Sequence, residues 1–135
     1  MELDKIIAIT GKPGLYKVLN QSKNGFVIES LTDGKRTTLI GNQNVSTLKD
    51  IAIYTYDEEF PLRFIFKSMF EKEGGKTTIS PDAKDAELMT YFEEIVPNFD
   101  KERVYPSNVK KVLKWYNQLV DSQFDFSTIQ KEDEA

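Results

Sequence analysis

The sequence predicts an α+β protein in which a small N-terminal SH3-like β-barrel is followed by a three-helix C-terminal unit. Up to about residue 57, short β-rich runs alternate with turn signals. Beyond it, apolar residues recur at the three- and four-residue spacing of amphipathic helices. The predicted domains are therefore residues 1–57 for the barrel and 58–123 for the helical unit, with a C-terminal tail at 124–135.

Five β-rich runs form the predicted barrel. Lys12-Pro13-Gly14 suits a type II turn, and Asn24-Gly25 and Asp33-Gly34 favour two-residue hairpins. Strands this short would leave exposed edges unless the sheet curls and closes, which is why a barrel is predicted. The five runs are residues 6–9, 15–20, 26–31, 36–40 and 51–56.

Three amphipathic helices follow. Pro61 suits the first position of the first helix, and Gly74-Gly75 should end it. Pro97 should end the second helix, and Ser107 is the expected N-cap of the third. Three such helices can share one small core. Their apolar residues are Leu62, Ile65, Phe66, Met69 and Phe70; Leu88, Tyr91, Phe92, Ile95 and Val96; and Val109, Val112, Leu113, Tyr116 and Val120.

The third helix combines lysines with a tryptophan, as a nucleic-acid-binding segment would. On a helical wheel Lys110, Lys111 and Lys114 lie opposite the apolar stripe, while Trp115 lies on its shoulder one turn from Lys111. Stacking platforms for nucleic acids need aromatic rings and cations on the same side. The wheel therefore favours an ordinary surface helix over a nucleic-acid surface.

Composition excludes many classes of site. The chain of 135 residues has a net charge of −4 and contains neither cysteine nor histidine. Zinc sites built on thiolates or imidazoles, Cys–His and Ser–His nucleophile pairs, haem ligation by histidine and disulfides are thereby excluded. The acidic balance argues against phosphate backbones and anionic membranes as partners. With no apolar segment of roughly 20 residues and no signal-peptide pattern at the start, a cytoplasmic protein without a cofactor is expected.

Three short patterns resemble catalytic motifs but are better explained structurally. The run GGKT at 74–77 lacks the earlier glycine of a phosphate-binding loop, since Phe70 stands in its place. The S-x-x-K spacing at 46–49 lacks the companion motifs of serine acyl-transfer enzymes. No calcium-loop pattern accompanies the carboxylates, and acids at a helix start are favoured by its dipole. These carboxylates are Asp82, Asp85, Glu87, Glu93 and Glu94.

Four runs are distinctive as a set: IIAITGKPGLYKVLNQSKNGFVIESL, LKDIAIYT, FEKEGGK and YFEEIVPNFDKERVYPSNVKKVLKWYN. In these runs the chain resembles a family of small Bacteroidetes proteins of unknown function. The resemblance reaches to about Val120. It implies an N-terminal β domain, a C-terminal helical domain and a cytoplasmic bacterial protein, and it implies no activity, ligand or catalytic residue.

Two function hypotheses from different classes remain, and an enzyme built on carboxylates comes third. The favoured hypothesis is a non-catalytic protein-interaction module that binds another protein or a second copy of itself. The alternative is an RNA- or DNA-binding barrel. It is disfavoured because the acids of the barrel nearly cancel its bases. The alternative patch consists of Lys12, Lys17, Lys35 and Arg36, with Lys23 and Lys49.

Four aromatic residues are the candidates for the interaction surface: Phe64, Trp115, Phe124 and Phe126. Phe64 lies opposite the apolar stripe of the first helix, where an exposed phenylalanine would be unusual. We therefore expect a cover over Phe64, supplied by the barrel, by residues 124–126 or by a second copy of the protein.

Overall fold

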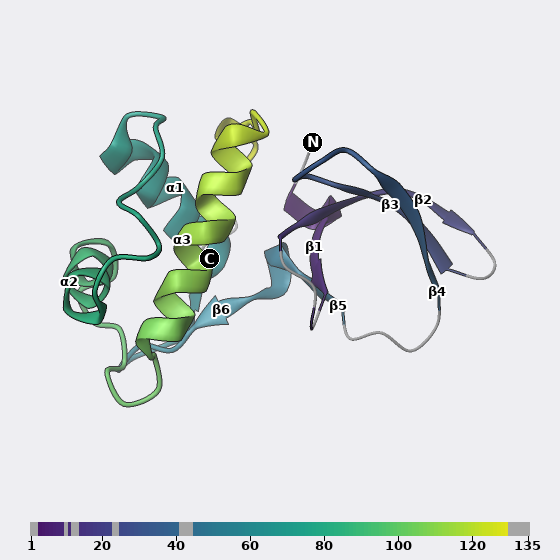
Figure 1. Ribbon diagram of the computed structural model, residues 1–135. Coiled ribbons are helices and arrows are strands. Elements are labelled where there is room, and N and C mark those ends of the chain that lie inside the picture. The colour runs from purple at the N-terminus through teal and green to yellow at the C-terminus, as the bar shows by residue number, and fades with distance from the viewer. Residues whose placement is uncertain (1–2, 10, 12–13, 23–24, 41–44, 130–135) are drawn as a thin grey trace.

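The protein consists of an antiparallel sheet and a group of three helices (Figure 1). The structure is a computed structural model that describes residues 3–9, 11, 14–22, 25–40 and 45–129. The sheet contains β1 (Ile6–Ile9), β2 (Tyr16–Ser22), β3 (Gly25–Ser30), β4 (Arg36–Ile40) and β5 (Val45–Thr47). The helices are α1 (Leu62–Glu73), α2 (Asp85–Ile95) and α3 (Pro106–Asp121). The α+β class is confirmed.

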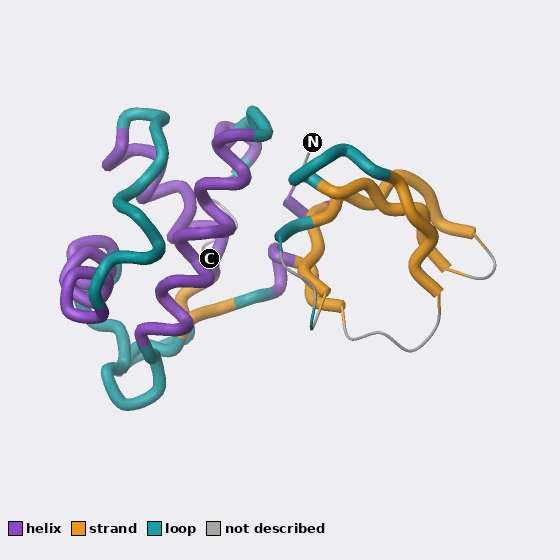
Figure 2. Tube along the Cα trace, in the orientation of Figure 1, coloured by secondary structure: helices purple, strands orange, loops and turns teal. Residues whose placement is uncertain are grey.

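Strands β1 to β4 form an antiparallel meander, and β5 pairs with β1 on its other side, which gives the strand order β4-β3-β2-β1-β5. A register shift between Val18 and Asn20 marks a bulge in β2, which adds to the curl visible in Figure 2. Within the described part of the chain, no ladder joins β4 to β5, so the sheet is open. The expected closure into an SH3-like barrel is not confirmed.

Alternation along the strands divides the apolar residues between two clusters. Ile7 packs with Ile9, Ile28 and Leu39 in a small cluster within the sheet. Ile6 belongs instead to the main core, which it shares with residues of all three helices. The two parts of the molecule are therefore joined by one continuous hydrophobic core.

The fifth predicted strand is wrong in position. The strand that completes the sheet is β5, which pairs with β1 through Thr47 opposite Ile7. The 3₁₀ helix η2 (Leu48–Asp50) follows β5, and its fully buried Leu48 anchors the chain in the main core. The run at 51–56 then supplies only β6 (Ala52–Ile53), which pairs with β7 (Phe60–Pro61) in a separate ladder.

The predicted turns have different outcomes. Lys12 and Pro13 of the first turn and Asn24 of the second lie outside the described residues. The connection at Asp33-Gly34 is longer than a two-residue hairpin, because β3 ends at Ser30 and β4 begins at Arg36. Gly34 has a φ of 75° and donates its N–H to the Ser30 carbonyl at 2.9 Å. The glycine thus has a turn role within a longer loop.

The helix signals are confirmed, with shifts at two starts. Gly74 ends α1 in the left-handed conformation, with φ 62°. Pro61 is the N-cap of α1 rather than its first residue, and α3 begins one residue before the expected cap, Ser107. Its N-cap is Tyr105, whose N–H is accepted by the Asn108 side chain at 2.8 Å. In α3 the fully buried residue near the end is Leu119 rather than Val120.

Residues 124–129, which the sequence assigns to a tail, pack against the helices. Phe124, Phe126 and Ile129 belong to the main core. The Phe126 ring stacks on Phe70 of α1 at a centroid distance of 4.5 Å. The 3₁₀ helix η3 (Phe126–Thr128) contains this ring, so the core extends beyond the end of α3.

Gln118 connects α3 to the sheet side of the molecule. Its Oε1 accepts the Leu15 backbone N–H at 2.6 Å, and its Nε2 donates to Thr32 Oγ1 at 2.6 Å. Gly14 lies beside this pair of hydrogen bonds with a φ of 82°. A Cβ on Gly14 would lie 2.9 Å from Thr32 Oγ1, closer than real Cβ contacts.

We expect Gly14→Ala to destabilise the protein more than Gly11→Ala. Both glycines have a positive φ, 82° and 85°, so both alanines carry a similar backbone strain of about 1–2 kcal/mol. At Gly14 the added methyl group must also displace the Thr32 hydroxyl from its hydrogen bond with Gln118, which adds roughly 0.5–1.5 kcal/mol. At Gly11 no atom of the residues that the structure describes lies within 4 Å of the added Cβ. Urea unfolding of the two variants measures the difference, and equal losses would contradict a tight contact at Gly14.

Candidate functional site

A cleft of about 470 Å³ lies between α3 and the sheet. Ala8 and Ser46, which are register partners on β1 and β5, line the sheet side. A second hollow of about 230 Å³ shares Ile51, Lys111 and Trp115 with the first and continues past Tyr54. We call the two together the α3 cleft. Its side chains from α3 include Asn108, Lys110, Lys111, Lys114, Trp115 and Gln118.

The sequence places these side chains through the periodicity of α3. Val109, Val112, Leu113 and Tyr116 turn to the core and are almost fully buried. The lysines lie off that stripe, as the wheel predicts. The wheel does not reveal that the sheet stands beside the helix there. Trp115 and the lysines consequently line one cleft. They therefore have the same-side arrangement of ring and cations that a nucleic-acid stacking platform needs and that the wheel did not predict.

Carboxylates partner some of the cations around the α3 cleft. Lys110 Nζ lies 3.2 Å from Asp82 Oδ1, and Arg103 Nε lies 2.8 Å from Asp100 Oδ2. Lys111 Nζ is 6.0 Å from the centroid of the Trp115 ring. In the described part of the chain, neither Lys111 nor Lys114 forms an ion pair. These two ammonium groups are the cations of the cleft that no carboxylate offsets.

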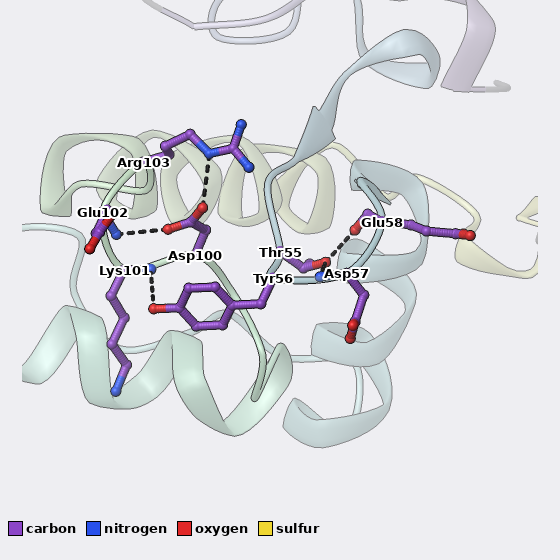
Figure 3. A network of polar contacts seen from close by, with 8 residues as sticks. All are labelled: Thr55, Tyr56, Asp57, Glu58, Asp100, Lys101, Glu102 and Arg103. Carbon is purple, nitrogen blue, oxygen red and sulfur yellow. Dashed lines mark hydrogen bonds and ion pairs between the residues drawn. The ribbon is translucent and has the colours of Figure 1, made fainter.

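A polar network fixes the end of the cleft that holds Arg103 (Figure 3). Asp100 accepts the Glu102 N–H at 2.9 Å in addition to its bond with Arg103. The Asp100 N–H in turn donates to the Tyr54 carbonyl at 2.9 Å. The Arg103 guanidinium lies over the Tyr54 ring, 4.4 Å from its centroid. Arg103 and Tyr54 are therefore held together at the cleft mouth.

Neighbouring contacts in Figure 3 order residues 55–58 and join them to residues 100–103. Tyr56 Oη accepts the Lys101 N–H at 3.2 Å. Thr55 Oγ1 donates to the Glu58 carbonyl and accepts the Asp57 N–H at 3.1 Å. These bonds satisfy backbone groups of two facing loops. We assign them a structural role in holding the cleft end.

The Asp100–Arg103 pair predicts a specific pH dependence. The hydrogen bond from Arg103, followed by that from the Glu102 N–H, lowers the pKa of Asp100 below its ordinary value. A lowered carboxyl pKa stabilises the fold above the unfolded pKa of about 3.9, and this stability is lost as pH falls through the folded pKa. We expect Asp100→Asn to unfold at lower urea than the wild type at pH 7, and this gap to narrow at pH 3. A gap that stays constant with pH would contradict a stabilising carboxylate.

Three of the four expected surface aromatics are buried and cannot form an exposed surface. Phe64, Phe124 and Phe126 are 4%, 5% and 3% exposed. The Phe60 ring packs 6.1 Å from that of Phe64, and the Arg63 guanidinium lies 4.7 Å over it. The cover over Phe64 therefore comes from residues close to it in the chain, Phe60 and Arg63. Of the four, Trp115 alone is partly exposed.

The alternative basic patch does not form a group of free cations. Lys12 and Lys23 lie outside the described residues. Lys17 and Arg36 both face Glu29, at 3.9 and 3.2 Å. Lys35 and Lys49 are exposed. The Glu29 carboxylate therefore offsets the charges of Lys17 and Arg36, the two patch cations that lie on strands.

The described residues contain no group of three or more carboxylates placed to hold a metal ion. Asp85 and Glu87 occupy the first turn of α2, where the helix dipole favours acids. Gly74 of the GGKT run is the cap of α1. No helix within the described ranges is both long enough and apolar enough to cross a bilayer.

Comparisons with known proteins agree with this architecture. One family model, Domain of unknown function (DUF5606), matches residues 3–48, and another, Domain of unknown function (DUF6852), matches residues 51–119. A solution NMR structure of a structural genomics target from Bacteroides vulgatus is 38% identical, with a TM-score of 0.74. The match covers 92% of this chain and 89% of that chain. The search of curated proteins returned no match.

The molecule is a small α+β protein in which an open antiparallel sheet shares its core with three helices. The chain belongs to the DUF6852 family and carries a DUF5606 segment before that domain. The expected kinship with Bacteroidetes proteins of unknown function is thereby confirmed.

Proposed function

We propose that the protein is a non-catalytic protein-interaction module of the bacterial cytoplasm and that the α3 cleft is its binding surface. The observation that carries the proposal is the joint placement of Trp115, Tyr54 and two unneutralised lysines along one cleft. Tryptophan, tyrosine and arginine are enriched at the residues that dominate protein interfaces. Ile51 adds an apolar wall, and the lysines supply charge at the rim.

Capture from the cytoplasm of a source bacterium tests this proposal. The double variant Lys111→Glu/Lys114→Glu reverses both unneutralised charges. The matched control Lys76→Glu/Lys84→Glu makes the same charge change at two exposed lysines outside the cleft. We expect the wild type and the control to retain the same protein partner after nuclease treatment, and the cleft variant to lose it. Equal capture by all three proteins would contradict a binding role for the cleft.

Nucleic-acid binding is the second candidate, because Trp115 and the lysines lie on the same side of α3. The charge is insufficient, since Lys111 and Lys114 alone escape carboxylates among the cleft cations that the structure describes. If binding rested on two phosphate contacts, raising the salt from 50 to 200 mM would weaken it only about tenfold, with a slope near −0.9 per contact. Non-specific binders with more contacts reach dissociation constants of about 10⁻⁴–10⁻⁶ M.

We expect no measurable binding to mixed single- or double-stranded RNA or DNA at about 0.15 M salt. Fluorescence anisotropy with labelled oligonucleotides measures this directly. Charge reversal at Lys35 and Arg36 should leave partner capture intact, because both lie outside the cleft. Submicromolar nucleic-acid binding that this double variant abolished would establish the alternative patch instead.

We also propose that the open sheet closes into an SH3-like barrel. The curled sheet supports it, because β4 and β5 are its two edge strands and closure requires contact between them. Amide hydrogen exchange distinguishes the two states. Slow exchange along the outer edges of both strands would support closure, and fast exchange along both would contradict it.

A further inference from the structure

We propose that the α3 cleft binds an extended acidic segment of a partner protein, with an apolar side chain of that segment against Trp115. This inference rests on the proposed function and specifies its partner. Three features of the cleft carry it: its length, the spacing of its free cations and its mixed apolar and polar walls.

The length of the cleft fits an extended chain. The cleft follows α3 from Asn108 to Gln118. Ten residues of helix rise about 15 Å, at 1.5 Å per residue. An extended peptide advances about 3.3 Å per residue, so the cleft accommodates about five residues.

The spacing of the cations fits carboxylates on alternate residues. Lys111 and Lys114 are three residues apart on α3, a separation that places two side chains on adjacent turns about 5–6 Å apart. Residues i and i+2 of an extended chain project to the same side about 6.6 Å apart. Two acidic residues separated by one other residue can therefore meet both ammonium groups. Lys110 is already paired with Asp82 and is not required.

The walls of the cleft suit the remaining side chains of such a segment. Trp115 is partly buried, and Ile51 lies beside it in both hollows. An apolar side chain placed there would remove apolar surface from water. Ser46 offers a hydroxyl on the facing strand, whereas Gln118 is already bonded to Leu15 and Thr32.

Trp115 makes the cleft directly observable, because it is the single tryptophan of the chain. Its fluorescence can be titrated with a pool of decapeptides in which alternate residues are Asp or Glu and a central residue is Leu. A matched pool carries Asn or Gln at the acidic positions. A ten-residue thymidine oligonucleotide tests for binding of a phosphate backbone. Far-UV circular dichroism confirms that each variant remains folded.

We expect the acidic pool to change the Trp115 emission saturably and the neutral pool to bind about tenfold more weakly, since two exposed charge pairs are lost. The Lys111→Glu/Lys114→Glu variant should lose at least about tenfold in affinity for the acidic pool, because charge reversal removes the two pairs and adds repulsion. The Lys76→Glu/Lys84→Glu control should bind as the wild type does.

The outcomes separate this inference from the proposed function. If neither pool changes the emission, or if both bind equally, the acidic-segment inference is overturned. A protein partner whose capture still depends on Lys111 and Lys114 would then leave the proposed function standing. If the oligonucleotide binds and the peptides do not, both proposals are overturned in favour of nucleic-acid binding.

Discussion

Replacing Leu113 by alanine is expected to lower the free energy of unfolding by about 2–5 kcal/mol, the usual range for emptying a core leucine site. Leu113 is 0% exposed and lies in the main core, where α3 meets the other helices. The fully buried Phe66 and Tyr116 share the same cluster. A core packed as densely as this one closes such a cavity only in part.

Lys114→Ala is the matched control, since the same helix carries it one residue later on the exposed side. Its effect on the free energy of unfolding should stay within about 0.5 kcal/mol. Urea unfolding followed by far-UV circular dichroism measures both variants. Similar losses for the two would show that the assignment of buried and exposed sides of α3 is incorrect.

The sequence was sufficient for the helices because each carries a long and regular apolar pattern. Gly74 could be assigned as a cap because only a few residue types tolerate a left-handed φ at a helix end. Ser107 was less informative, since Tyr105 and Asn108 supply an N-terminal cap through backbone and amide groups. Such a cap has no simple one-residue signal.

The fifth strand shows where local propensity fails. The run at 51–56 is richer in β-branched and aromatic residues than β5 itself. Burial of Leu48 in the main core turns the chain away from the sheet after Thr47. Ile53 is then buried beside the helices instead of in the sheet. Long-range packing therefore decided which of two competing runs joined β1.

The candidate site required knowledge that a single helical wheel does not contain. The wheel correctly separates the buried side of α3 from the side that bears Lys111 and Lys114. It assigns every position off the core stripe to solvent, whereas Ala8 and Ser46 of the sheet stand opposite these lysines across the cleft. The wheel of α1 likewise places Phe64 opposite the apolar stripe, and it does not reveal that the neighbouring Phe60 ring covers this side chain.

Phe126→Ala is expected to cost about 3–5 kcal/mol, the range for emptying a buried phenylalanine site. Phe126 is 3% exposed. Its ring stacks on Phe70 and lies 5.0 and 5.5 Å from the rings of Phe124 and Tyr116. Aromatic pairs of this kind contribute about 0.5–1.5 kcal/mol beyond the area they bury. The loss should therefore fall toward the upper part of the range.

Phe26→Ala provides the matched control, since this phenylalanine lies on β3 and is 38% exposed. Its loss should be about 1 kcal/mol, close to the average for a point substitution. If residues 124–135 formed a solvated tail, Phe126→Ala would cost no more than about 0.5 kcal/mol. A loss several times that of Phe26→Ala would instead place the end of the core at η3, beyond the last turn of α3. Urea unfolding of the full chain decides between these two results.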